Sequence, residues 1–525
     1  MRQLDPQTPV LVGVGQASDF LDRPDYRQLS AVELAASAAR AAISDCGVAP
    51  RVIAGQIDTV VGIRQFENST PVAIAPLGRS DNYPRSVADR IGADPRRAIL
   101  GVSGGQAPQQ LVTEMAGAIA RSASGVTLIF GAEAISTVRH LATAEGRPDF
   151  TERRGGQLED RGYGLQGLVA ETETVHRIVG APSRYALFEN ARRARVKQTR
   201  SEYALSMGQL LEPFTAVAAG NVHAAAPIER TAVELATVTE RNRMIADPYP
   251  RFMVSRDQVN QGAAVLLMSI GAAQELGVPE SKWIFLHGHC DLREKELLAR
   301  PDLSTSPAAI AAAAHALRVA DVEADHLSFI DLYSCFPIAV SNVCDGLGLS
   351  PADPRRLSVS GGLPFFGGAG NNYSMHAIAE TVVRLRSAPG SFGLVGANGG
   401  YLSKYSVGVY STRPVRWRDS ESGDVQANLD AAPSVLSTEM ADGWAVVESY
   451  TTTYGPAGRT GIVVGRLEDG RRFLANSIDG DVEMQNLLAD EQPVGESVFV
   501  RSGRAGRNLV AANEEAMVEL AEQLP

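Results

Sequence analysis

The chain has 525 residues, of which 44% are apolar and 21% charged, and its formal net charge is −11. This length exceeds what one hydrophobic core holds, so the sequence predicts about two to four globular domains and not a disordered chain. The acidic balance and the lack of a long Lys/Arg cluster argue against nucleic acid or an anionic membrane as the partner.

The cysteines and the N-terminal residues indicate the compartment. Cys46, Cys290, Cys335 and Cys344 form no C-x-x-C pair, and no His/Cys set has metal-ligand spacing. Four cysteines in so long a chain are typical of reduced thiols. The first residues lack the basic region and apolar run of a signal peptide, and no apolar segment reaches the ~20 residues of a membrane span. We expect a cytoplasmic protein without membrane insertion, metal or disulfides.

The first part of the chain alternates strands with helices. Ser30 caps an alanine-rich helix over residues 31–47. Residues 103–108 (SGGQAP) form a glycine-rich turn before a further helix, which points backbone N–H groups at a ligand but does not match the dinucleotide-binding spacing. Strand, helix, strand predicts a parallel sheet. The predicted strands are residues 9–15, 56–63, 97–101 and 125–133.

Residues 139–246 are richer in charged and polar side chains, and we expect a helical loop domain inserted over the sheet. One short helix there carries a basic run at 192–197, and this run is either a solvated face or a phosphate contact. Residues 261–270 return to the apolar strand pattern.

The second half repeats the first. Residues 284–289 read as a strand, 306–322 as an alanine-rich helix, and 326–333 and 391–400 as further strands. Two such halves predict similar domains about a pseudo-twofold axis with a site between them. The predicted domains are 1–270 (with the insertion at about 139–246), 271–413, and 414–525. The last combines a linker with short alternating strands typical of an OB-like β-domain.

Several of these segments resemble the thiolase superfamily, namely residues 10–16, 32–47 and 126–136 and the duplicated halves. Residues 242–264 resemble the sterol-carrier-protein-thiolase branch, and within it the thiolase-like proteins of type 1 with an extra C-terminal domain. The resemblance covers about residues 8–412. It implies the five-layer αβαβα fold and an acyl-CoA or CoA ligand with no other cofactor. Thiolases usually dimerise through the strand beside the nucleophile helix, and here a monomer or a homodimer stays open.

Thiolase chemistry needs a nucleophilic cysteine, a histidine in a G-H-P turn, a second cysteine and a histidine or asparagine at the oxyanion hole. The resemblance places Gly104, beside Ser103, at the first position, Gly368 at the second and Ala397 at the third. Tyr333 stands where the family has His or Asn. Because glycine and alanine cannot act as nucleophile or base, we do not expect a thiolase reaction.

Three groups remain as catalytic candidates: Tyr333, Asn371 and His376. The phenol of Tyr333 either donates a hydrogen bond or acts as an acid or base, or it is a buried hydroxyl satisfied by backbone. Aldolase-like members of the superfamily carry a tyrosine at this motif and a second one near the G-H-P turn, where Tyr373 is the available substitute. Asn371 either polarises a thioester carbonyl or holds a turn.

The remaining predicted contacts are substrate-binding residues. They are Ser103, Gly104, Gly105, Gly368, Gly399 and Gly400 from the two halves and Asn221 and His223 from the loop domain. Three functions follow: binding of acyl-CoA or CoA without thiolase activity, a C–C lyase reaction on β-hydroxyacyl-CoA that uses Tyr333, or a scaffold that works through protein contacts.

Overall fold

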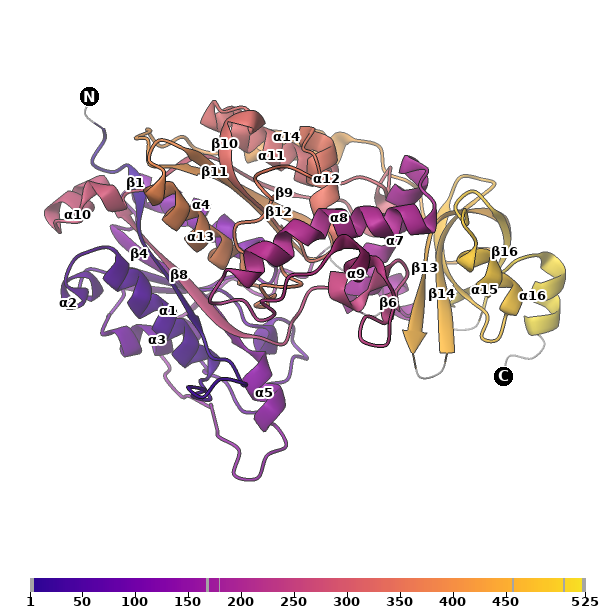
Figure 1. Cartoon of the computed structure of the whole chain (residues 1–525), viewed down its shortest axis with the longest axis horizontal. Helices are drawn as coiled ribbons and strands as arrows, with labels where there is room; N and C mark the ends of the chain where they lie inside the picture. The colour runs from indigo at the N-terminus through magenta and orange to yellow at the C-terminus, as the bar shows by residue number, and fades with distance from the viewer. Residues whose placement is uncertain (1–3, 167–169, 179, 456–457, 504–505, 522–525) are drawn as a thin grey trace.

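The computed structural model describes residues 4–166, 170–178, 180–455, 458–503 and 506–521. Its larger body has two mixed β-sheets with helices outside and between them, and a smaller strand-rich unit follows at the C-terminal end (Figure 1). None of the helices in these ranges is both long and apolar enough to cross a membrane.

The first sheet has the strand order β1-β8-β4-β2-β3-β5. Strands β2, β3, β4 and β5 run parallel to one another, whereas β8 is antiparallel to both β1 and β4. The strands are β1 (Pro9–Ser18), β2 (Thr59–Gly62), β3 (Arg97–Leu100), β4 (Val126–Ala134), β5 (Glu159–Asp160) and β8 (Asn260–Ser269).

The second sheet has the order β10-β11-β12-β9. Its members are β9 (Phe285–Arg293), β10 (Leu327–Leu332), β11 (Phe392–Gly399) and β12 (Lys404–Ser411). β10 is parallel to β11, and β12 is antiparallel to both its neighbours. This repeats β2-β4-β8-β1 of the first sheet in order and direction, so the predicted duplication is confirmed.

Helices fill three layers around these sheets. α1 (Ala31–Asp45) and α3 (Tyr83–Ile91) cover the outer face of the first sheet. α4 (Ala107–Ala120) and α13 (Tyr373–Ser387) each contact both sheets and lie between them. α11 (Pro307–Ala320) and α12 (Pro337–Leu347) cover the second sheet. The five-layer αβαβα fold expected from the resemblance is therefore confirmed.

Glycines let the alanine-rich outer helices approach the strands closely. A Cβ added at Gly15 of β1 would stand 2.2 Å from the backbone oxygen of Ala38 in α1, and one at Gly288 of β9 would stand 2.0 Å from that of Ala316 in α11. Since carbon and oxygen cannot approach so closely, only glycine permits this helix–sheet distance. The two halves use the same packing device.

The segment between β4 and β8 carries β5 and the helices of the loop region. It contains α5 (Ile135–Leu141), α6 (Glu171–Val175), α7 (Gly180–Val196), α8 (Arg200–Ala219) and α9 (Ala232–Ala236), followed by the short strands β6 (Met244–Ala246) and β7 (Tyr249–Pro250). Glu189 of α7 is buried and accepts hydrogen bonds from Tyr249, Tyr203 and the backbone N–H of Ile338, the second residue of α12. This carboxylate ties the loop region to the start of α12.

The basic run on α7 is engaged by the protein itself. Arg192 and Arg195 both form ion pairs with Asp345, at 2.8 and 2.7 Å. Arg193 is buried and donates to the hydroxyl of Tyr450 in the C-terminal unit. These arginines therefore connect α7 to α12 and to the C-terminal unit, and these contacts argue against a phosphate site on α7.

The C-terminal unit is a closed five-stranded barrel, as the OB-like prediction requires. β14, β15, β17, β16 and β13 follow one another, and β13 pairs with β14 to close the ring. β6 of the loop region extends this sheet through Ala246, which pairs with Thr453. The barrel elements are β13 (Gly443–Gly455), β14 (Gly458–Leu467), β15 (Arg472–Ser477), α15 (Val482–Ala489), β16 (Ser497–Ser502), β17 (Asn508–Ala511) and α16 (Glu514–Ala521).

The segment before the barrel is ordered against the second sheet. Its helix α14 (Ser422–Ala431) contacts β9 and α11. His287 and His289 of β9 each place Nε2 at hydrogen-bond distance from a backbone oxygen, of Arg413 at 2.8 Å and of Arg418 at 3.0 Å. These histidines hold the 413–418 segment in place.

Candidate active site

A cavity of about 560 Å³ lies where the glycine turns of the two halves meet the loop region. It gathers eight of the predicted residues: Ser103, Gly104, Gly105, Tyr333, Gly368, Asn371, Gly399 and Gly400. The turns before α4 and α13 and the ends of β10 and β11 supply them, which explains why residues so distant in sequence meet. His376, Asn221 and His223 are not among the residues that line it.

Tyr333 follows the last residue of β10, and its N–H donates to the oxygen of Gly396. Its side chain is buried and packs edge-on against Tyr373, with ring centroids 5.4 Å apart. Within the described part of the chain, no protein group hydrogen-bonds the Tyr333 hydroxyl. Burial and the neighbouring Cys335 raise its pKa far above the ordinary value of 10, so the phenol stays protonated and can only donate or accept a hydrogen bond.

Other side chains fill the space beside the glycines of the cavity. A Cβ at Gly105 would stand 2.1 Å from the Tyr333 hydroxyl, one at Gly368 2.5 Å from Ser255 Oγ, and one at Gly399 1.7 Å from Gln106 Oε1. The turns therefore have no room for larger residues as the structure stands. Tyr333, Ser255 and Gln106 take the volume that side chains at these positions would need.

Asn371 links the two halves. Its Oδ1 accepts from the N–H of Gly104 at 2.9 Å, and its Nδ2 donates to Arg64 O at 2.6 Å and to Ser69 Oγ at 2.9 Å. Both amide hydrogens are thus committed to protein acceptors. In this arrangement Asn371 positions the turn that carries Gly104 and has no free N–H for a ligand.

Ser103 and Cys335 line the cavity but lack activation. The Ser103 hydroxyl donates to Ser69 O at 2.9 Å, and no histidine or carboxylate accepts from it in the described residues. Burial raises the pKa of the Cys335 thiol to about 12, although the polar groups of Tyr185 and Asn398 oppose the shift. A thiol with this pKa carries almost no thiolate at neutral pH.

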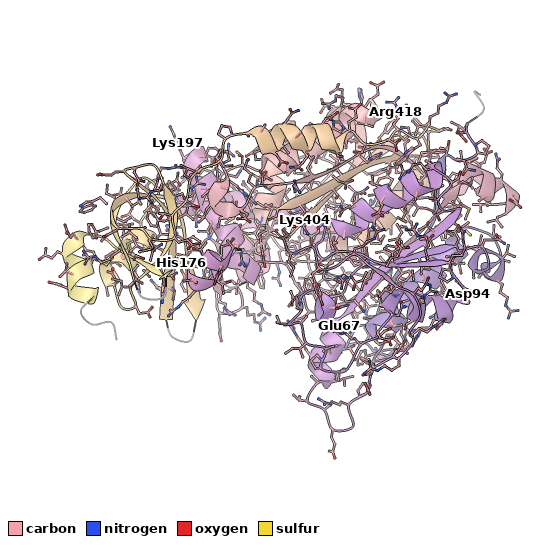
Figure 2. The ribbon with its side chains drawn as sticks, turned by 180° about the vertical axis from the view of Figure 1, so that it is seen from behind. Glu67, Asp94, His176, Lys197, Lys404 and Arg418 are labelled. Atoms are coloured by element: carbon pink, nitrogen blue, oxygen red, sulfur yellow. The ribbon has the colours of Figure 1, made fainter. Side chains whose placement is uncertain are left out.

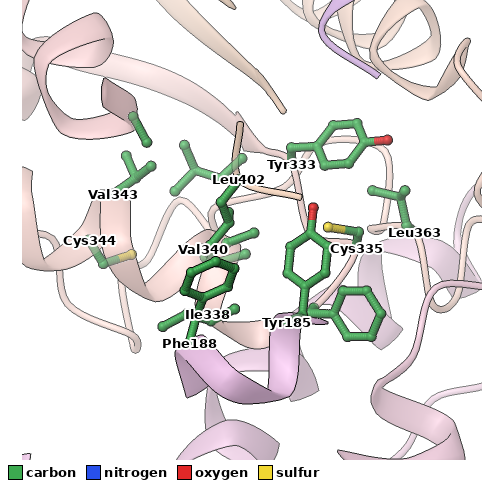
Figure 3. Packing of buried hydrophobic residues seen from close by; sticks show 14 of the residues in the cluster. Tyr185, Phe188, Tyr333, Cys335, Ile338, Val340, Val343, Cys344, Leu363 and Leu402 are labelled. Atoms are coloured by element: carbon green, nitrogen blue, oxygen red, sulfur yellow. The ribbon is translucent and has the colours of Figure 1, made fainter. Parts of the chain in front are cut away.

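Tyr185 and Asn398 complete the wall around Cys335. The side chains of Tyr185 and Cys335 converge beside Tyr333, with Leu363 on the other side of the sulfur (Figure 3). Asn398 Nδ2 donates to the Tyr185 hydroxyl at 2.8 Å, and that hydroxyl donates to Gly400 O at 3.2 Å. Tyr185 is not predicted from the sequence, because nothing on helix α7 distinguishes it from a core aromatic. Asn398 directly follows Ala397, the residue that the resemblance places at the second-cysteine position.

Tyr373 is the suggested second tyrosine, and it lies outside the cavity. Its ring is fully buried, and its hydroxyl lies 2.6 Å from Ser360 Oγ and 3.3 Å from Asp331 Oδ1. The Asp331 carboxylate also accepts from the N–H groups of Val359 and Ser360. Tyr373 therefore belongs to a buried network that supports the strand end, and it does not pair with Tyr333 as a catalytic dyad.

His376, Asn221 and His223 belong to a second buried polar cluster. His376 Nδ1 lies 2.7 Å from Gln16 Oε1, and Gln16 in turn donates to Glu380 at 2.9 Å. Asn221 donates to the same Glu380 oxygen at 3.1 Å and accepts from the N–H of His223. Burial and His223 lower the pKa of His376 well below the usual 6.5, so its ring is neutral. This cluster joins the loop region to both halves.

Two ionisable groups lie at the edge of the cavity. Lys404, near the centre of the view in Figure 2, donates from Nζ to Ser103 O and Gly164 O. Burial lowers the pKa of its ammonium group. The Glu133 carboxyl accepts from the N–H of Phe66, a cavity residue, and burial raises its pKa well above 4.5. Neither group reaches Tyr333 through a hydrogen bond in the described residues.

Comparison with known proteins identifies a family model and solved structures that are similar to this chain. Residues 424–504 match the family model described as the thiolase-like protein type 1 additional C-terminal domain. The chain is 47% identical to a monomeric SCP2-thiolase-like protein type 1 from Mycobacterium smegmatis, over 97% of this chain and 100% of that one, with a TM-score of 0.85. No match was found among curated protein sequences.

More distant structures share the fold alone. The Ltp2-ChsH2(DUF35) aldolase is 18% identical, with a TM-score of 0.56 over 78% of this chain and 100% of that one. Human mitochondrial 3-ketoacyl-CoA thiolase is 17% identical, with a TM-score of 0.54 over 77% of this chain and 99% of that one.

Proposed function

Because the chain belongs to the SCP2-thiolase-like proteins of type 1, we propose that it binds an acyl-CoA or CoA thioester in the Tyr333 cavity and does not perform the thiolase reaction. The observation that carries this proposal is the Tyr333 hydroxyl, which has no partner among the described residues and lies in a cavity formed by the glycine turns of both halves. A hydroxyl that lines a cavity and has no protein partner in the described residues is available to donate to a ligand carbonyl.

The ionisation state of the cavity supports binding without thiolysis. The Cys335 thiol is protonated, the Ser103 hydroxyl is held by Ser69, and Gly104 and Gly368 stand at the positions that the family resemblance assigns to nucleophile and base. Tyr333 is protonated as well, so it acts as a hydrogen-bond donor to the thioester carbonyl and not as a base.

A C–C lyase is the second candidate, and the tyrosine in the cavity favours it. In such a reaction Tyr333 is suited to donating a hydrogen bond to a developing enolate. Its raised pKa makes it a poor base for the β-hydroxyl, and Tyr373 is committed to Ser360 and Asp331. This arrangement supports the binding role more directly than the lyase role.

Calorimetry with CoA and with acetyl-CoA tests the proposal. We expect both to bind the full-length protein, and acetoacetyl-CoA with CoA to show no thiolytic turnover. Tyr333→Phe removes only the hydroxyl, so it should weaken acetyl-CoA binding by about tenfold, the value of one lost hydrogen bond, and leave CoA binding unchanged.

Tyr405→Phe is the matched control. Tyr405 is also a buried tyrosine whose hydroxyl has no partner in the described residues, but it does not line the cavity. Equal loss of acetyl-CoA affinity in both variants would show that the carbonyl does not meet Tyr333. A β-hydroxyacyl-CoA cleavage that Tyr333→Phe abolishes would replace the binding role by the lyase role.

A further inference from the structure

A pocket of about 760 Å³ lies between α10 (Ile270–Glu275), the start of β9 and residues 412–418, and Figure 1 shows α10 at the end of the molecule away from the barrel. We infer that this pocket, called here the Trp283 pocket, binds a medium-chain aliphatic carboxylate, an ion with an apolar tail and one negative charge. It shares no described lining residue with the Tyr333 cavity, so the inference does not depend on the proposed function.

The walls of the Trp283 pocket are largely apolar. Their apolar members are Leu4, Ile270, Trp283, Phe285, Pro414 and Val415. Ile270, Trp283 and Phe285 are buried members of the core cluster on the outer side of the first sheet, so a tail bound here would extend an existing core. A site of this volume with apolar walls and few polar groups is typical of small-molecule sites.

The charged residues of the pocket select the sign of the ligand. In the described residues Arg416 forms no ion pair or side-chain hydrogen bond, and Arg418 donates only to the backbone oxygen of Val319, at 2.9 Å. Both guanidinium groups thus lack a carboxylate partner in a chain whose net charge is −11. Together with Glu280 they leave one net positive charge in the pocket. A monoanion balances that charge, whereas a pyrophosphate would exceed it.

The arginines and the glutamate line different parts of the pocket. Arg416 lies at one end, because it also lines a neighbouring pocket together with Leu4 and Pro6, whereas Glu280 lines only the Trp283 pocket. The carboxylate of the ligand therefore belongs at Arg416 and its tail along the wall of Trp283. The indole N–H of Trp283 is buried and has no acceptor among the described residues, so this wall holds a further donor for a carboxylate oxygen.

The backbone that carries the two arginines is fixed before a ligand binds. His287 and His289 place Nε2 at 2.8 Å from Arg413 O and at 3.0 Å from Arg418 O. The ring of Trp417 stacks on His289, with centroids 4.7 Å apart. Arg418 lies at the upper edge of the molecule in Figure 2, apart from Lys404 at the edge of the Tyr333 cavity. A site built in advance in this way loses less entropy when it binds an ion.

Titration calorimetry on the full-length protein tests the inference with sodium octanoate, octylamine, octan-1-ol and sodium acetate. We expect octanoate to bind, whereas octylamine carries the wrong charge and acetate has no tail, so neither should bind. In Arg416→Gln/Arg418→Gln the affinity for octanoate should fall by about tenfold or more, because charge-assisted contacts between arginine and carboxylate are strong. Octan-1-ol should bind the native chain and this variant with equal, weaker affinity.

Tryptophan fluorescence shows where the ion binds. Octanoate should change the emission of the native chain, which has three tryptophans, because Trp283 lines the pocket. Trp283→Phe keeps an aromatic ring in the wall and should lose this change. Trp444 lies on β13 of the barrel, so Trp444→Phe should retain it. A change that is equal in both variants would place octanoate elsewhere and overturn the inference.

Arg51→Gln/Arg153→Gln is the matched control, because both arginines are exposed, lie outside the pocket and remove the same total charge. Its affinity for octanoate should equal that of the native chain. If the native chain does not bind octanoate, or if the pocket variant binds it as tightly as the control does, the inference is wrong. Acetyl-CoA should bind the native chain and the pocket variant equally, so the proposed function succeeds or fails separately.

Discussion

At the level of single residues, neighbouring side chains occupy the space beside the glycines of the cavity. Ser255 Oγ stands where a side chain on Gly368 would be, and the Tyr333 hydroxyl stands where one on Gly105 would be. Gly104 has φ +129°, a conformation that other residues avoid. Placing a histidine or cysteine at one of these positions would therefore meet an occupied volume, so one substitution is not enough to build a thiolase site.

The four cysteines provide a direct test of this chemistry. All are buried, and burial raises the pKa of Cys290 to about 11 and those of Cys335 and Cys344 to about 12. At pH 7.5 a thiol of pKa ~12 has a thiolate fraction on the order of 10⁻⁴ or less. We expect iodoacetamide to leave the native protein unlabelled under conditions that alkylate the urea-unfolded chain fully, as read by mass spectrometry. Rapid, stoichiometric labelling of Cys335 would contradict this and restore it as a nucleophile.

Glu67, beside the cavity residue Phe66, should make stability depend on pH. Burial raises the pKa of its carboxyl from 4.5 to about 7, although Arg79 opposes the shift. Between these two values the folded state holds a proton that the unfolded state has released, so the contribution of Glu67 to stability is greatest below pH 4.5 and is lost as the pH rises through 7.

Glu67→Gln removes this proton exchange. Urea unfolding at pH 5 and pH 8 should show a smaller loss of stability in the variant than in the native chain. We expect a difference of about 1 kcal/mol, after allowing for solvent around this half-buried side chain. Equal pH dependence in both proteins would show that Glu67 is not the group responsible.

At the level of elements, the contact between each alanine-rich helix and its sheet depends on glycine in the strand. Gly288→Ala should be strongly destabilising, because the new Cβ would stand 2.0 Å from Ala316 O and 2.8 Å from Ala320 N, both backbone atoms of α11. Such overpacking costs about 1–3 kcal/mol or more, since the helix must move away from β9. Chemical denaturation measures this loss.

Gly423→Ala is the control for that experiment. Gly423 lies in α14, and a Cβ there would meet nothing within 4 Å. Removing a glycine from a helix should stabilise the protein by about 0.5–1 kcal/mol. If Gly288→Ala proved equally harmless, the close packing of β9 against α11 would not be required for the fold.

The strands and helices that the sequence predicted are those with a strong local pattern. Apolar runs ended by glycine gave β1, β4, β8 and β11, and Ser30 marked the start of α1 through a capping box with Glu33. β12 went unpredicted, because its residues follow a glycine turn closely and contain Gly408, which weakens the strand pattern. The pairing of β6 with the barrel is a tertiary contact that no local signal carries.

The candidate site was likewise predictable from the sequence only in part. Glycine turns and the end of β10 were recognisable from motifs, and the structure brings them to one cavity. The part that was not predicted is contributed by long-range contacts, namely those of Tyr185 from α7 and of Ser255 beside Gly368. Only the folded chain shows that His376 and His223 form a separate buried cluster, because sequence spacing does not give side-chain direction.

At the level of the whole molecule, the strand edge by which thiolases usually dimerise is covered by the chain itself. The two residues of β5 pair in parallel with β3, Ile99 opposite Glu159 and Leu100 opposite Asp160. Arg97 of β3 and Glu159 of β5 form an ion pair at 2.8 Å, and Asp160 pairs with the buried Arg64. A covered edge has no free N–H and C=O groups for a second copy to pair with.

The native chain should therefore have the mass of one protomer in light scattering. Arg97→Glu sets two carboxylates against each other at the β3–β5 contact, which should release β5 and expose the edge of β3. We expect the apparent mass of this variant to rise with concentration. The charge-swapped pair Arg97→Glu/Glu159→Arg restores the attraction and should return the protein to a monomer. If Arg97→Glu stays monomeric at all concentrations, pairing of β5 with β3 is not what prevents association of two chains.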